Sequence, residues 1–177
     1  AAAFDLAWIL TNSYTASTTV SATMKIAAMA GIKIFATGGV GGVHRNFAKI
    51  PDISHDIHTL AKESMLVVTA GAKAILDLQA TVEALETHGV LTVGYGTRQF
   101  PAFYYRDSGI NLNYETKDLE IIVKTFRLLN HKQSILVANP IPKKYEIPKN
   151  IIEPIIASTI KKALEIKIMG KNLTPYL

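Results

Sequence analysis

The chain has 177 residues, of which 49% are hydrophobic and 19% are charged, so it can bury a sizeable core and wholesale disorder is excluded. It has no cysteine, which excludes disulfide frameworks, thiolate metal sites and a cysteine nucleophile. No segment has the pattern of a secretory leader or a membrane span, and we expect a cytoplasmic protein. Organelle targeting stays open, since the chain does not begin with methionine.

The net charge of +5 raises the question of nucleic acid binding. Most of the excess follows Lys117, in Lys143–Lys144, Lys161–Lys162, Lys167 and Lys171. These lysines lie beside helix-periodic apolar residues, with no interleaved aromatic residues and no nucleic-acid motif. We therefore expect a solvated basic face and no nucleic acid partner, while an anionic small substrate would suit the charge.

Apolar periodicity predicts alternating strands and helices. In chain order we expect a helix at 18–29, a strand at 32–36, a helix at 55–62, a strand at 65–69, a helix at 72–87, a strand at 90–93, a helix at 117–129, a strand at 135–138 and a helix at 151–166. Short apolar strands separated by helices are typical of a parallel sheet covered on both faces. No composition break marks a linker, so residues 1–177 are predicted to form a single α/β domain.

Ligands of such folds gather outside the carboxyl ends of the strands. Four turns lie there, at 37–45, 70–73, 94–98 and 139–142. In the last of them, Asn139 could present its amide to a ligand. The aromatic run at 101–105 could stack a base or simply fill the core.

The first of these turns contains four glycines, at positions 38, 39, 41 and 42. Such a loop could let the backbone approach a ligand, or it could be a tight strand exit. It is not a dinucleotide-binding fingerprint, because counting from Gly39 places His44 where the third glycine belongs. It is not a P-loop either, because no Gly-Lys-Ser/Thr follows.

Asp52 and Asp56 lie four residues apart around an expected helix start. Carboxylate oxygens suit magnesium or manganese. Alternatively, Ser54 or Asp52 could cap the helix while Asp56 complements its dipole. The spacing leaves both interpretations open.

Lys73 is expected in the first turn of the helix at 72–87, directly after a buried strand. The positive end of the helix dipole and desolvation by small apolar neighbours would both lower the pKa of its amine. A Schiff-base lysine requires this, although a lysine that extends to the surface would fit the same position.

Taken together, six segments in the same order resemble the pseudouridine-5'-phosphate glycosidase family, also named after indigoidine synthesis protein A. They are 18–24 (TTVSATM), 35–45 (FATGGVGGVHR), 52–56 (DISHD), 70–78 (AGAKAILDL), 83–87 (EALET) and 137–142 (VANPIP). The resemblance implies a three-layer α/β/α fold with a largely parallel central sheet, a homotrimer and a divalent metal, usually Mn²⁺. Members of the family are longer at both ends, so residues 1–177 would be the central part of a longer chain.

The resemblance also implies roles for matching residues. Lys73 falls on the nucleophile, Asp52 on the metal ligand, and Asp56 and His44 are the candidates for moving protons. The predicted substrate-binding residues are Thr19, Val20, Thr37, Ser54, His55, Asp56 and, from its place at a strand end, Asn139.

The implied reaction is the reversible cleavage of pseudouridine 5'-phosphate to uracil and ribose 5-phosphate, through an imine between Lys73 and C1' of the ribose. A pseudouridine kinase would be the partner in the same pathway. Alternative hypotheses are a non-catalytic sugar-phosphate-binding remnant of the family, a nicotinamide-binding protein, which the glycine spacing disfavours, and a nucleic-acid-binding module motivated by charge alone.

Overall fold

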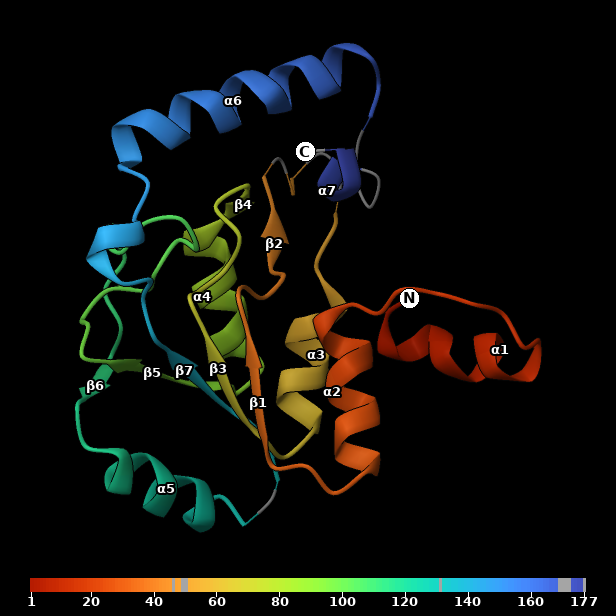
Figure 1. Cartoon of the computed structure of the whole chain (residues 1–177), viewed down its shortest axis with the longest axis vertical. Coiled ribbons are helices and arrows are strands. Elements are labelled where there is room, and N and C mark those ends of the chain that lie inside the picture. Colours follow the sequence, from red (N-terminus) through yellow and green to blue (C-terminus); the bar gives the residue numbers. More distant parts are fainter. Residues whose placement is uncertain (46, 49–50, 131, 169–172, 177) are drawn as a thin grey trace.

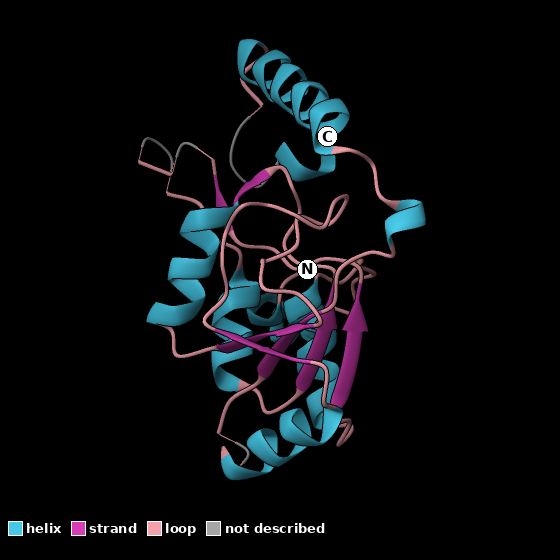
Figure 2. Cartoon of the chain, turned by 90° about the vertical axis from the view of Figure 1, so that its left-hand side faces the viewer, coloured by secondary structure: helices cyan, strands magenta, loops and turns pink. Residues whose placement is uncertain are grey.

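The fold is built on a five-stranded sheet in which all neighbouring strands run parallel. Across the sheet the strands are β1 (Ile34–Thr37), β3 (Leu66–Thr69), β7 (Ile135–Ala138), β5 (Leu91–Tyr95) and β6 (Tyr114–Thr116). A separate antiparallel pair joins β2 (Val43–His44) to β4 (Leu76–Asp77). The computed structural model in Figures 1 and 2 describes residues 1–45, 47–48, 51–130, 132–168 and 173–176.

Helices connect and cover these strands. They are α1 (Leu6–Thr11), α2 (Val20–Met29), α3 (His55–Lys62), α4 (Leu78–Thr87), α5 (Leu119–Leu128), α6 (Lys149–Glu165) and α7 (Leu173–Tyr176), with 3-10 helices η1 (Ala3–Asp5) and η2 (Lys143–Tyr145). Four of the helices begin after a residue whose side-chain oxygen accepts a backbone N–H, namely Thr19, Ser54, Asp77 and Asp118. Of the two capping alternatives for the 52–56 segment, Ser54 is therefore the cap. Within the described ranges, no helix is long and apolar enough to cross a membrane.

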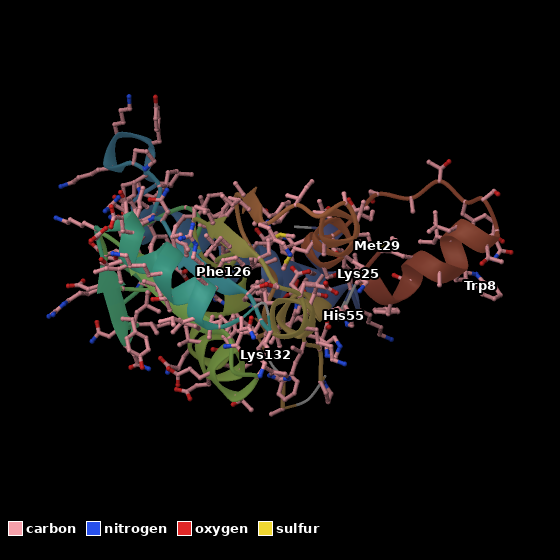
Figure 3. All side chains as sticks on the ribbon, turned by 90° about the horizontal axis from the view of Figure 1, so that it is seen from below. Trp8, Lys25, Met29, His55, Phe126 and Lys132 are labelled. Atoms are coloured by element: carbon pink, nitrogen blue, oxygen red, sulfur yellow. The ribbon has the colours of Figure 1, made fainter. Side chains whose placement is uncertain are left out.

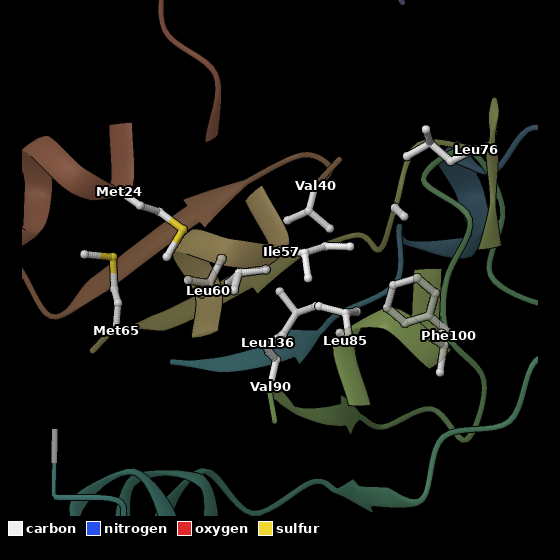
Figure 4. Packing of buried hydrophobic residues seen from close by; sticks show 14 of the residues in the cluster. Met24, Val40, Ile57, Leu60, Met65, Leu76, Leu85, Val90, Phe100 and Leu136 are labelled. Carbon is white, nitrogen blue, oxygen red and sulfur yellow. The ribbon is translucent and has the colours of Figure 1, made fainter. Parts of the chain in front are cut away.

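Successive side chains along each strand point to opposite faces of the sheet, and helices cover both faces. On β7, Leu136 and Ala138 join a core cluster with residues of α2, α3 and α4, where Figure 4 shows Leu136 near Ile57 and Leu85. Ile135 and Val137 face the opposite way and pack with Phe126 and its neighbours on α5. The expected three-layer α/β/α fold with a largely parallel sheet is confirmed.

The four expected strands of the sheet are confirmed, with boundary shifts of one or two residues. The fifth strand, β6, was not predicted, because three residues with exposed Tyr114 carry little periodic signal. The helix expected at 72–87 is wrong at its start. It begins at Leu78, because Ala72 pairs with Val40 and residues 76–77 pair with β2, which commits this backbone to bridges before a helix can form.

Two helices lie outside the three layers. In Figure 1, α6 lies beyond the edge at which the strands end, and α1 extends away from the sheet. Figure 3 shows Trp8 of α1 far from the body, and its side chain is 69% exposed. The sheet thus fixes the strand-end turns, while α6 closes the space above some of them.

Candidate active site

The carboxyl ends of β1, β3 and β7 meet at a cavity of about 690 Å³, here called the strand-end cavity. Thr37, Ala70 and Asn139, each at or just after the end of one of these strands, contribute to its wall. Of the four turns expected to hold ligands, three therefore contribute, while the turn at 94–98 does not line this cavity. Thr37 and Asn139, both predicted as substrate-binding, are brought together here.

A second cavity of about 320 Å³, here called the lysine cavity, lies between the 73–75 turn and α6. Lys73 supplies its only charged lining side chain among the described residues, and the α6 residues are Ile152, Ile155, Ile156 and Thr159. In the part of the chain that the structure describes, the Lys73 amine has no hydrogen-bond or ion-pair partner. Its surroundings in this cavity are mostly apolar.

The position of Lys73 differs from the sequence-based expectation. The residue lies in a turn five positions before α4 begins, so the dipole of that helix does not act on it as predicted. Its backbone N–H instead donates to the carbonyl of Val40 at 3.3 Å. The glycine loop, rather than a helix, holds Lys73 in place.

Phe103 and Tyr104 line both cavities and form the wall between them. Phe103 has a φ of 61°, in the left-handed region that non-glycine residues rarely adopt, and its N–H donates to Ala70 O at 3.0 Å. A Cβ at Gly39 would lie 2.6 Å from its ring. Gly39 therefore lets the ring pack on the β1 exit. Of the three aromatic residues in the 101–105 run, only Tyr105 is buried in the core.

Gly41 and Gly42 also pack closely against other segments of this chain. A Cβ at Gly41 would overlap Ser54 and lie 2.9 Å from Asp56 Oδ2, and one at Gly42 would overlap Thr81. The close approach of other segments of this chain is thus sufficient reason for glycine at 39, 41 and 42. This packing agrees with the tight-exit interpretation, while Gly38 lines the strand-end cavity and a close approach of the loop to a ligand stays a prediction.

Asp56 joins three segments next to the glycine loop. Its Oδ1 accepts the N–H of Ser21 and its Oδ2 the N–H of Gly41, both at 2.8 Å, and the residue is only 4% exposed. Thr19 extends the network, since its hydroxyl lies 2.8 Å from the Ser21 hydroxyl. Both carboxylate oxygens are therefore occupied in holding α2 and the glycine loop against α3, and a role in moving protons stays a prediction.

His44 and Asp52 face each other across a short backbone pairing. His44 Nε2 lies 3.7 Å from Asp52 Oδ2, and the His44 N–H donates to the Asp52 carbonyl at 3.0 Å. Asp52 Oδ2 is buried and has no hydrogen-bond partner in the described part of the chain. A buried acceptor without a partner is costly, so this oxygen fits a site where a cation or water binds.

His55 and Val20 lie beside the Asp56 network. The His55 ring contacts Phe4 and His58, with centroid distances of 5.1 and 4.8 Å. Burial and the neighbouring charge of His58 lower the pKa of His55, opposed by the weaker effects of Asp56 and Asp5. Val20, the first residue of α2, packs against the core.

The predicted residues thus fall into three groups: Thr37 with Asn139, His44 with Asp52, and Thr19 with Ser54 and Asp56. Among the described residues, no hydrogen bond or ion pair joins the Lys73 side chain to any of them. The sequence analysis considered Phe103 and Tyr104 only as part of the 101–105 run, which could stack a base or fill the core, and it did not select Arg45. Aromatic and basic residues in a loop carry no periodic signal of their partners.

The fold and its cavities define a three-layer α/β/α protein with its candidate site at the carboxyl edge of a parallel sheet. The chain belongs to the indigoidine synthase A-like protein family, which matches residues 1–177. It is 49% identical, over 180 residues, to the pseudouridine-5'-phosphate glycosidase of Petrotoga mobilis, covering 100% of this chain and 59% of that protein. It is 47% identical to the protein of the same name from Brachyspira hyodysenteriae, with 98% and 57% covered.

Two solved structures are similar throughout the chain. The prealnumycin C-glycosynthase AlnA, in complex with ribulose 5-phosphate, superposes with a TM-score of 0.91 at 34% identity and covers 99% of this chain and 59% of that one. An indigoidine synthase A-like protein from Thermotoga maritima gives 0.86 at 32% identity, with 99% and 58% covered. The chain therefore spans slightly less than three fifths of the length of these relatives.

Proposed function

We propose that this chain is part of a pseudouridine-5'-phosphate glycosidase, which reversibly cleaves the C-glycosidic bond to give uracil and ribose 5-phosphate. The observation that carries the proposal is the amine of Lys73, which has no partner among the described residues and lines an apolar cavity that shares Phe103 and Tyr104 with the strand-end cavity. The name of the Petrotoga relative and the sugar phosphate bound to the C-glycosynthase support the same substrate class.

A lysine nucleophile suits this bond. A carbon–carbon bond has no leaving oxygen or nitrogen that an acid could protonate. In the proposed sequence, the neutral amine of Lys73 bonds to C1' while the bond from C1' to the ring oxygen breaks, and the ring oxygen takes that electron pair and the proton that the nitrogen loses. The nitrogen lone pair then forms a C=N bond while the bond from C1' to uracil breaks, and the uracil carbon takes that electron pair and a proton. Water finally hydrolyses the imine and releases ribose 5-phosphate.

Other residues have proposed roles around this step. His44 and Asp56 are the candidates for moving protons. The strand-end cavity offers the Thr37 hydroxyl and the exposed Asn139 amide, neutral groups that suit the hydroxyls of a sugar or the edge of uracil. The Phe103 and Tyr104 rings offer flat surfaces against which uracil could stack.

Asp52 is the proposed ligand of a divalent cation, Mn²⁺ by the family resemblance. Its buried Oδ2 has no partner among the described residues and fits a hard cation. The described residues hold no group of three or more His, Cys, Asp or Glu side chains able to share a metal, so water or substrate oxygens would complete the coordination. A cation there would polarise substrate oxygens.

We also propose that the protein assembles as a homotrimer. Support comes from the apolar residues of the first segment that project into solvent, including Phe4, Trp8 and Leu10.

The proposal is tested by covalent trapping on the full-length natural chain. The protein is incubated with ribose 5-phosphate and borohydride, with and without manganese, and adducts are mapped by mass spectrometry. We expect a reduced ribose 5-phosphate adduct on Lys73 that is lost in Lys73→Ala and kept in Lys124→Ala, which removes an exposed lysine of α5. A folded full-length protein that forms no adduct would favour the non-catalytic sugar-phosphate-binding alternative.

A further inference from the structure

Arg45 holds the turn that carries Lys73. Its Nη2 donates to the Ala74 carbonyl at 2.7 Å and its Nε to the Leu76 carbonyl at 3.3 Å. These two carbonyls belong to the first and third residues after Lys73. Together with the bond from Lys73 N–H to Val40 O, they fix the backbone on both sides of the lysine.

The same guanidinium also reaches α6. Arg45 Nη2 lies 3.3 Å from Glu153 Oε2, and the Tyr105 hydroxyl donates to Glu153 Oε1 at 2.7 Å. Glu153 follows Ile152 and precedes Ile155 and Ile156 by two and three residues, and all three isoleucines line the lysine cavity. One carboxylate therefore fixes the helical turn that forms the far wall of that cavity.

The surroundings favour a fixed geometry. Tyr105 is 2% exposed and packs with Ala74, Ile156 and Ile160 in one apolar cluster. Burial, followed by the hydrogen bond to Glu153, raises the pKa of Tyr105, so its hydroxyl remains a donor at neutral pH. A planar guanidinium can serve two carbonyls and a carboxylate together, which the single ammonium of a lysine does poorly.

We propose that Arg45 is a positioning residue for Lys73, which joins the 73–76 turn to α6 through Glu153 and so sets the shape of the lysine cavity. The inference rests on the proposed function, because it assigns Arg45 to the same reaction. Arg45 is absent from the lining of both cavities, so its loss should slow adduct formation and leave substrate affinity nearly unchanged.

The first test measures trapping kinetics on the full-length chain. In Arg45→Ala we expect the rate constant at saturating ribose 5-phosphate to fall about 100-fold, as misplacement of a reacting group by about 1 Å can do, with an unchanged half-saturation concentration. The matched variant is Arg98→Ala, which should keep the wild-type rate. The Arg98 side chain is 81% exposed and pairs with Glu115 at 3.0 Å. Added methylguanidinium should restore part of the rate in Arg45→Ala, and Arg45→Lys should restore less than half of it.

A second readout needs no sugar phosphate. The rate at which a small acylating reagent modifies Lys73, relative to exposed Lys124 in the same chain, is measured by mass spectrometry. We expect Arg45→Ala to change this ratio by on the order of tenfold, because the 73–76 turn and α6 separate when Arg45 no longer joins them. Glu153→Gln should change the ratio in the same direction. Arg98→Ala should leave it unaltered.

The outcomes separate the two proposals. If wild-type protein forms no adduct with ribose 5-phosphate, the proposed function fails, and the labelling ratio still decides whether Arg45 positions Lys73. An unchanged labelling ratio in Arg45→Ala overturns the inference. The inference is also overturned if the trapping rate of Arg45→Ala falls only in proportion to the folded fraction, measured by circular dichroism, and does not respond to methylguanidinium.

Discussion

At the scale of single residues, the Asp56 carboxylate holds three separate segments of the fold together. Its two oxygens accept the N–H groups of Ser21 and Gly41, which come from segments far apart in the chain. Because each oxygen has a donor, neither can be replaced by an NH₂ group without placing two donors against each other.

Asp56→Asn should therefore destabilise the fold by about 1–3 kcal/mol, the cost of leaving a buried hydrogen-bonding group unsatisfied. Urea unfolding of the full-length chain measures this. The control is Asp118→Asn at the exposed cap of α5, where asparagine caps about as well as aspartate, so its stability should change by less than about 0.5 kcal/mol. Equal effects in both variants would contradict the bridging role of Asp56.

At the scale of elements, the β1 exit and the aromatic wall depend on each other. The Phe103 ring lies over the two glycines that follow β1, and the residue holds a left-handed backbone conformation to do so. The partition between the two cavities therefore depends on a contact between residues more than sixty positions apart.

Substituting alanine at these glycines should give graded effects. A Cβ at Gly39 would lie 2.6 Å from the Phe103 ring, whereas one at Gly38 would lie 3.2 Å away, at a distance that a small shift relieves. We expect Gly39→Ala to cost about 1–3 kcal/mol, the usual range for overpacking, and Gly38→Ala clearly less. Thermal and urea unfolding of the pair test the order, and a greater loss in Gly38→Ala would show that Phe103 does not pack as described.

At the scale of the whole molecule, the start of the chain is attached to the body partly through His55. Phe4 of η1 packs edge-on against its ring, and Asp5 is among the charges that act on it. Because burial and His58 lower the pKa of His55 below 6.5, the unfolded chain binds this proton more readily than the folded one. The contribution of His55 to stability is thus fully present above pH 6.5 and is lost as the pH falls through the lowered pKa.

The melting temperature of the wild type should consequently fall more than that of His55→Gln when the pH is lowered from about 7.5 to about 5. The control is His88→Gln, at the exposed end of α4, which should keep the wild-type difference. Scanning calorimetry at the two pH values measures the change. A pH dependence that is the same in all three proteins would rule out this role for His55.

Local signals in the sequence determined the framework of this protein. The apolar runs at 65–69 and 135–138 predicted two of the inner strands, and Ser54 was one of two candidate caps for the helix at 55–62, because periodicity and capping act between near neighbours. The strand-end turns at 37, 70 and 139 were also predictable, since a parallel sheet brings these ends to one edge.

Only the tertiary structure decided how the candidate site is built. The pairing of β2 with β4 moved the start of α4 from Ala72 to Leu78 and placed Lys73 in a turn, because bridges to distant segments took the backbone groups that a helix would have used. The Phe103 wall and the contacts of Arg45 with Ala74 and Glu153 likewise join residues distant in sequence. Such contacts leave no periodic trace, since each depends on where the sheet brings two separate segments together.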